Sequence, residues 1–265
     1  MTAPQSVAAA IREALLEPDP RAKAMRTRAV ARGFRHGDLR FAFDCAMPDY
    51  PGRPARPELL APRHMPKRGR AQSLRGRIAL YHALAHIEFV AIDLALDMAG
   101  RFGAEMGPQF VSDFLSVAAD EAMHFALLER RLRGLGSGYG ALPAHGGLWD
   151  TAYATRHDVA ARLALVPMVL EARGLDVTPG TIANLQAGGD DVGTRILQRI
   201  LEDEIRHVRI GATHFNAVCR TRSIEPESHW KDLITLHFRG RVKPPFNDSA
   251  RQAAGLSRSY YAMLA

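Results

Sequence analysis

The sequence predicts an all-α protein, a four-helix bundle with one long crossover connection. Four long stretches after residue 73 place apolar residues at steps of three or four, whereas no segment alternates in the manner of a half-buried strand. A short turn joins the first two of these stretches, and residues 134–147, with six glycines, form a connection long enough to run along a bundle. At 265 residues and 47% hydrophobic content the chain can bury a full core, which excludes a wholly disordered protein.

The helices are expected in the following order. Two short helices cover residues 4–17 and 19–32, and the long helices cover residues 73–102, 108–132, 149–173 and 191–220. Gly174 and Pro179 are expected to interrupt the third long helix, which resumes over 181–187, because a structureless segment of that length is rare inside a compact domain. A shorter helix over 226–238 precedes a proline-containing tail. We therefore expect N-terminal helices with a basic arm (1–72), the bundle (73–222) and a C-terminal helix with its tail (223–265).

Positive charge is concentrated near the N-terminus. Residues 21–77 hold 15 Lys or Arg against four acidic residues, a charge of +11 in a chain whose total is +7. Six prolines between residues 48 and 66 prevent a continuous helix there, so this stretch is expected to be an extended basic arm. Such an arm suits contact with RNA or another polyanion, but it has few aromatic residues for stacking on bases. Packing of the arm on the main domain is the preferred interpretation.

Other classes of protein are excluded or disfavoured by composition. Cys45 and Cys219 are too few for a disulfide framework or a thiolate metal site. No uncharged apolar run approaches the roughly 20 residues needed to cross a bilayer, and the first 17 residues lack the pattern of a secretory signal. We expect a cytoplasmic protein that does not span a membrane.

One pentapeptide pattern, D-E-x-x-H, occurs on two of the expected helices. It comprises residues 120–124 and residues 203–207, and its Glu and His lie on one face of a helix. A further glutamate stands 33 residues before the glutamate of each copy, on each of the other two helices. The metal-ligand candidates are thus Glu88, Glu121, His124, Glu171, Glu204 and His207.

These six residues fall in rows of otherwise apolar or small side chains, so we expect them to be buried. Buried carboxylates without a countercharge cost on the order of several kcal/mol each, and two divalent metal ions would neutralise four of them. Mixed carboxylate and imidazole ligation suits iron or manganese. A buried polar network without metal is the alternative. Pro167, one turn before Glu171, is expected to kink the third helix, and His82 and His86, outside the row of Glu88, are expected to be a capping or surface pair.

The series Glu88, Glu121-x-x-His124, Glu171, Asp203-Glu204-x-Arg206-His207 resembles the ferritin-like non-haem di-iron carboxylate superfamily over residues 73–220. The whole chain most resembles an uncharacterised bacterial group of ferritin-like proteins, and more distantly the tRNA hydroxylases that act on isopentenylated adenosine. The resemblance implies that Asp203 orients His124 from outside the ligand shell, with Asp120 in a matching role.

The function implied is a non-haem di-iron, or di-manganese, oxidoreductase that activates dioxygen to oxidise or hydroxylate a small organic substrate. Such a site needs an external electron donor, because the chain shows no flavin, ferredoxin or nicotinamide motif. One alternative is a tRNA-modifying hydroxylase whose arm, through Arg68, Arg70 and Arg75, would hold RNA. The other is a ferroxidase that handles iron. We expect a monomer or small homo-oligomer rather than a cage.

Overall fold

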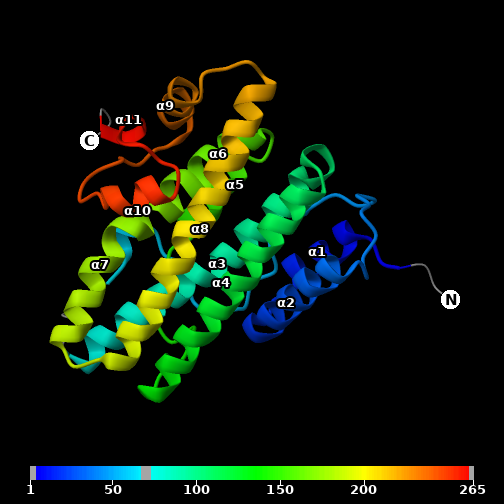
Figure 1. The fold of residues 1–265 in the computed structure, drawn as a ribbon. Helices are drawn as coiled ribbons and strands as arrows, with labels where there is room; N and C mark the ends of the chain where they lie inside the picture. Colours follow the sequence, from blue (N-terminus) through cyan, green and yellow to red (C-terminus); the bar gives the residue numbers. More distant parts are fainter. Residues whose placement is uncertain (1–3, 67–72, 263–265) are drawn as a thin grey trace. The chain divides into compact units, whose positions relative to one another are not determined.

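The computed structural model describes residues 4–66 and 73–262, and its regular secondary structure there is helical (Figure 1). The only pairings of β type among the described residues are two isolated bridges, Ser6 with Arg40 and Leu59 with Ala144. The all-α prediction is therefore confirmed. By its internal contacts the chain divides into two units, Met1–Gly146 and Gly147–Ala265, which are described in turn.

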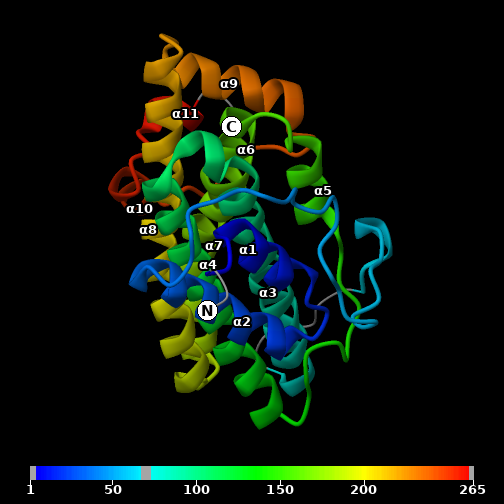
Figure 2. The ribbon, with the colours of Figure 1, turned by 90° about the vertical axis from the view of Figure 1, so that its right-hand side faces the viewer.

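The first unit is built on two long antiparallel helices, α3 (Leu74–Met106) and α4 (Pro108–Gly134). Ser73 caps α3 by accepting a 3.0 Å hydrogen bond from the backbone N–H of Gly76, and Gly107, at φ +88°, makes the sharp turn into α4. Two shorter helices, α1 (Val7–Leu16) and α2 (Pro20–His36), pack against α3 and α4 respectively (Figure 2). Their predicted positions are confirmed.

The segment that follows α2 packs on the first unit. Gly100 and Gly103 of α3 lie directly against Met47 and Phe43, so closely that a Cβ at either glycine would collide with them. Backbone hydrogen bonds from Leu60 N–H to Ala144 O, 2.8 Å, and from Ala144 N–H to Glu58 O, 2.9 Å, tie the segment to the crossover. The preferred interpretation of the arm is thus confirmed for its described part. The first residues of the basic stretch are helical, as predicted for 19–32, and α2 continues to His36. Arg68 and Arg70 lie outside the described residues.

The second unit contains one long helix and several short ones. In chain order they are α5 (Gly147–Ala154), α6 (Val159–Leu165), the π-helix η2 (Val166–Glu171), α7 (Ala172–Ala187), α8 (Asp191–Thr221), α9 (Pro226–His237), α10 (Asp248–Ala253) and α11 (Arg258–Tyr261). η2 and α7 both pack against α8, which confirms the predicted fourth long helix.

Two predictions about the third long helix are wrong. It is not continuous from residue 149, because Asp158 ends a turn after α5 and starts α6 by accepting a 3.0 Å hydrogen bond from Ala160 N–H. Nor do Gly174 and Pro179 interrupt it, since α7 runs through both. Pro179 removes the donor to the carbonyl of Leu175, and the side-chain amide of Asn247 donates to that oxygen instead, at 3.2 Å.

The expected distortion at Pro167 is confirmed, and it takes the form of the π-helix η2. Because proline lacks an N–H, the regular bond to the carbonyl of Leu163 cannot form, and a wider turn accommodates the loss. Gly211 of α8 faces Pro167 so closely that a Cβ there would meet the proline ring. The π-helix and the glycine opposite it therefore form one packing unit.

α3 is long and apolar enough to cross a membrane by length and composition alone. Two thirds of its most apolar window, 67%, is buried inside the protein, as is typical of the core helix of a soluble protein. One such helix is weak evidence for a membrane span, and the cytoplasmic location stays a prediction.

Candidate metal centre

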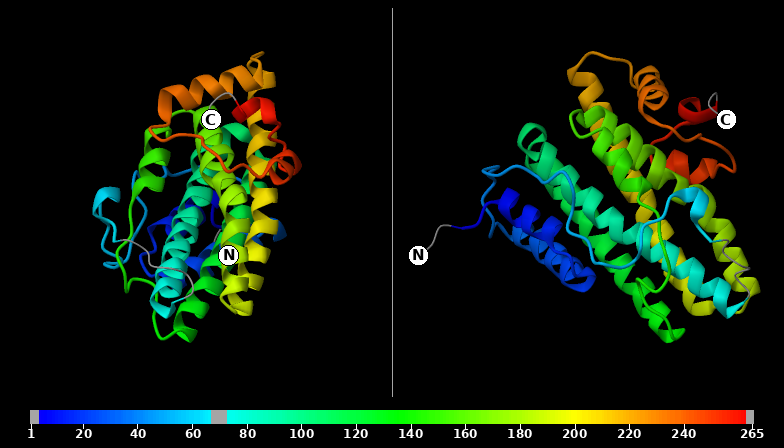
Figure 3. Two further views of the ribbon diagram at one scale, coloured as in Figure 1. Left: turned by 90° about the vertical axis from the view of Figure 1, so that its left-hand side faces the viewer. Right: turned by 180° about the vertical axis from the view of Figure 1, so that it is seen from behind.

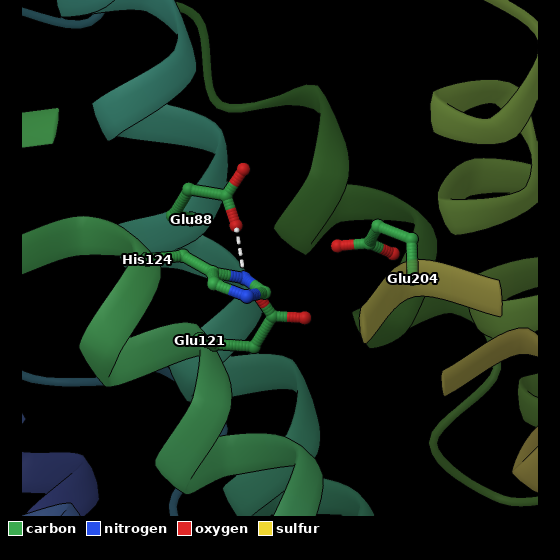
Figure 4. Close-up of side chains that lie close together, drawn as sticks. All are labelled: Glu88, Glu121, His124 and Glu204. Atoms are coloured by element: carbon green, nitrogen blue, oxygen red, sulfur yellow. Dashed lines mark hydrogen bonds and ion pairs between the residues drawn. The ribbon is translucent and has the colours of Figure 1, made fainter. Parts of the chain in front are cut away.

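Three of the predicted ligands meet inside the first unit. Glu88 lies on α3, and Glu121 and His124 lie one turn apart on α4. Their side chains are buried, with residue exposures of 5%, 1% and 0%. His124 Nδ1 lies 3.3 Å from Glu88 Oε2, the contact drawn as a dashed line in Figure 4, and 3.2 Å from Glu121 Oε2. The three residues are a buried group with the chemistry to hold a metal ion.

These separations match those between neighbouring ligand atoms around one ion. Oxygen and nitrogen ligands lie about 2.0–2.2 Å from a small divalent metal, so two ligands at tetrahedral or octahedral angles are about 2.8–3.6 Å apart. The contacts of 3.2 Å and 3.3 Å fall in that interval, while the donor set of two carboxylates and one imidazole suits iron or manganese. The residues therefore fit a metal ion.

Burial makes this group electrostatically demanding. The pKa of Glu88 is raised well above its ordinary value, first by loss of solvent and then by the neighbouring Glu121 carboxylate, and the hydrogen bond and charge of His124 offset only part of this. The metal-free alternative has to keep protons on these buried groups, whereas a cation would stabilise both carboxylates in their charged form.

The second unit brings together one further pair of predicted ligands. Glu204 and His207 lie one turn apart on α8, both buried, with His207 Nδ1 3.8 Å from Glu204 Oε1. Glu204 is also among the side chains drawn in Figure 4. Glu171 is the last residue of η2, half-buried, on a segment that packs against α8. Its place beside the other two ligands stays a prediction, as does one site shared by the two units.

The aspartates of the two pentapeptides are half-buried. Asp203 Oδ2 accepts a 2.7 Å hydrogen bond from Arg199 Nε, one turn earlier on α8, and this ion pair was not foreseen. The orienting roles expected of Asp120 and Asp203 stay predictions.

The glycine-rich crossover contributes a tyrosine that sequence reasoning missed. Tyr139 stacks on the rings of His82 and His86 and also packs against Phe89 and Phe125, the residues that follow Glu88 and His124 in sequence. His86 Nδ1 bonds Tyr139 Oη at 2.9 Å, and burial raises the pKa of the Tyr139 phenol.

The two histidines that hold the crossover are buried, so of the two roles expected for them, capping or surface, the surface role is wrong. His82 Nε2 accepts hydrogen bonds from the backbone N–H groups of Gly140, 3.0 Å, and Leu142, 3.3 Å. His86 Nε2 donates to the carbonyl of His145 at 3.1 Å, which leaves Nδ1 to accept from the tyrosine. Both histidines thus fix the crossover on α3. The pattern HxxxH gave a faint signal of a shared helix face, but Tyr139 stands in a stretch with no periodicity.

Comparison with known proteins identifies a family whose description states no activity. Residues 16–262 match the family described as "Protein of unknown function (DUF455)". An uncharacterised protein of Haemophilus influenzae is 42% identical over 211 residues, which cover 77% of this chain and 73% of that protein. No solved structure matches.

Proposed function

Because the chain belongs to the DUF455 family, whose description states no activity, we propose from its own residues that it is a di-metal carboxylate oxidoreductase. The observation that carries the proposal is the convergence of Glu88, Glu121 and His124 at separations that suit a metal ion. The second unit repeats the same ligand types at the same 33-residue spacing, through Glu171, Glu204 and His207. The proposed ligand set thus holds four carboxylates and two imidazoles, half of them from each copy of the sequence pattern.

The charge balance explains why two ions are proposed rather than one. Four glutamates carry four negative charges, which two divalent cations neutralise, and one histidine per ion completes a set of nitrogen and oxygen ligands. A pair of iron ions held in this way supplies dioxygen activation when an external donor provides electrons, and manganese suits the same ligands. The apolar surroundings, including Phe89 and Phe125, exclude water from the ligands of the first unit.

The test is the metal content of the full chain, expressed with iron or manganese supplied. We expect about two ions per chain, and an optical spectrum of the oxidised protein typical of an oxo-bridged iron pair. Glu88→Ala and Glu204→Ala are each expected to abolish that content while helicity by circular dichroism is kept. The matched control is Glu202→Ala, which changes an exposed glutamate on the same helix and should keep both ions.

The results separate three cases. Retention of both ions by Glu204→Ala overturns the proposed six-residue ligand set. One ion, lost with Glu88→Ala but kept with Glu204→Ala, leaves a metal only in the first unit and removes the di-metal proposal. Absence of metal under every condition removes the metal centre altogether. Sedimentation adds a test of the expected monomer or small oligomer, because a ferroxidase of the ferritin type would assemble as a cage.

A further inference from the structure

The second unit contains a pocket whose charge has no role in the proposed metal centre. It has a volume of about 270 Å³ and lies between η2, the first turns of α7 and the segment that follows α9. The part of the chain that closes it is drawn in orange and red in Figure 3. Phe238 and Val242 come from that segment, and Met168 and Val169 of the π-helix supply further apolar wall.

The charged lining is strongly unbalanced. Four cationic side chains face one carboxylate, Asp176, which leaves an excess of three positive charges around a pocket of this size. The cationic residues are Arg173, Arg241, Lys243 and Arg251. Cations gathered around a half-open pocket repel one another and attract an anion, most strongly where water is partly excluded.

The inner part of this lining is held rigidly. Arg251 is 3% exposed, and its Nε and Nη2 donate to the two oxygens of Asp176 at 2.8 Å and 2.7 Å. Its guanidinium also packs on the rings of Phe246 and Tyr261. Because the bidentate pair and the two rings hold its guanidinium in place, Arg251 is a fixed positive group rather than a flexible one. Its Nη1 lies outside the contact with Asp176.

A second arginine holds the wall formed by the C-terminal segment. Arg173 Nη1 donates to the carbonyls of Lys243, at 2.8 Å, and Pro245, at 3.1 Å, and Asp176 accepts from the backbone N–H of Asn247 at 3.0 Å. The backbone at residues 243–247 is thus anchored to α7, while the side chains of Arg241 and Lys243 remain exposed at the pocket. These two charges have no ion pair among the described residues.

We propose that this pocket binds a small organic anion, with a phosphate or carboxylate head group bound by Arg241, Lys243 and the fixed arginines, and an apolar body against Phe238 and the π-helix. A concave pocket with apolar walls and a few convergent charges is the usual form of a small-molecule site, and this half-open pocket has that form. The inference goes beyond the proposed metal centre and does not depend on it, since none of the six predicted metal ligands lines the pocket.

The test is calorimetric titration of the full chain with phenyl phosphate and with benzoate, which share an aromatic body and differ in the head group. We expect saturable binding of at least one of them, weakened as salt rises, and binding of phenol at least about tenfold weaker. The double variant Arg241→Gln/Lys243→Gln should lower affinity by about tenfold or more. It leaves the Asp176 pair in place, so its melting temperature should match that of the unchanged chain.

Arg239→Gln is the matched control. This exposed arginine lies two residues before Arg241 and does not line the pocket, so its removal should change affinity less than about twofold. The proposal is overturned if neither anion binds at millimolar concentration, if phenol binds as well as the anions, or if Arg239→Gln weakens binding as much as the double variant. Equal affinity for inorganic phosphate and phenyl phosphate overturns the role of the apolar wall. The two anions decide between phosphate and carboxylate as the head group.

Discussion

The two D-E-x-x-H segments have the same letters and different surroundings. The copy on α4 lies against α3, a helix of 33 residues without interruption, and its histidine is within 3.3 Å of two glutamates. The copy on α8 lies against the π-helix at Pro167, and its histidine is 3.8 Å from the glutamate on its own helix. Glu88 reaches the α4 pair from a regular helix, whereas Glu171 of the second unit ends a π-helix.

The irregularity has a direct effect on where Glu171 points. A π turn contains about one residue more than an α turn, so each residue after it is rotated by about 100° relative to a regular helix. Glu171 ends this turn, and Pro167 with Gly211 fixes its place against α8. The direction of Glu171 thus depends on the packing of Pro167 against Gly211, whereas Glu88, Glu121 and His124 are placed by regular helices.

In each unit a buried ion pair ties a terminal segment to a region that carries predicted metal ligands. Lys23 of α2 pairs with Asp93 of α3 and also donates to the carbonyls of Leu15, 3.0 Å, and Gly52, 2.9 Å. Arg251 pairs with Asp176 in the second unit. Asp93→Ala or Asp176→Ala leaves a buried cation without its partner, and each should lower the free energy of unfolding by about 3–5 kcal/mol in chemical denaturation.

The control for this largest effect removes both charges of a pair. Lys23→Met/Asp93→Leu should restore most of the stability lost in Asp93→Ala, because a buried pair gains little over apolar side chains of similar volume. A double variant as unstable as Asp93→Ala would contradict this. It would show that the contacts of Lys23 with its three acceptors stabilise the unit by more than the free energy that burying the charge costs. Comparing the two single variants also tests whether the two units unfold together, since independent units would give two transitions.

Gly211→Ala tests the packing of the π-helix. The added Cβ meets the ring of Pro167, so we expect a loss of about 1–3 kcal/mol in the free energy of unfolding. Gly180→Ala is the matched control, because nothing lies within 4 Å of a Cβ at that helical position, and it should be neutral or stabilising by up to about 1 kcal/mol. The same Gly211 variant should lose metal while keeping its helicity. Full metal content in a destabilised Gly211→Ala protein would show that the packing of the π-helix does not position the metal ligands.

The sequence allowed the side chains that recur at helical spacing to be predicted, but not those whose positions depend on partners far away in the sequence. Glu121 and His124 are marked by their i, i+3 spacing in an apolar row, and Glu88 by its matching distance. Nothing local predicts that Asp176 is buried, since its partner Arg251 lies 75 residues away. The helix through Pro179 was likewise unpredictable, because a side chain at residue 247 replaces the hydrogen bond that proline removes. Tertiary contacts overrode local propensity in both cases.

The smallest effect concerns the crossover, whose Tyr139 packs on Phe89 and Phe125. Burial lowers the pKa of His86 from its ordinary value of 6.5 to about 4, and the nearby Arg53 adds to the shift, while the bond to His145 opposes it. Since the folded-state pKa lies below the unfolded one, the unfolded chain binds the proton first. The stability contributed by neutral His86 is therefore full above about pH 6.5 and is lost as the pH falls toward 4.

We expect the free energy of unfolding to fall by about 1–2 kcal/mol through this group between pH 6.5 and pH 5, and His86→Gln should remove that loss. Asp93, whose pKa is raised by burial to about 6, has the opposite pH dependence, so the measured quantity is the difference between variant and unchanged chain at each pH. Denaturant titrations at both pH values give it directly. The structure places His86 with Nδ1 accepting from Tyr139, and a proton there would turn two donors toward each other. A difference that does not vary with pH would mean that the pKa of His86 is the same in the folded and the unfolded chain, and it would contradict the effect assigned to burial.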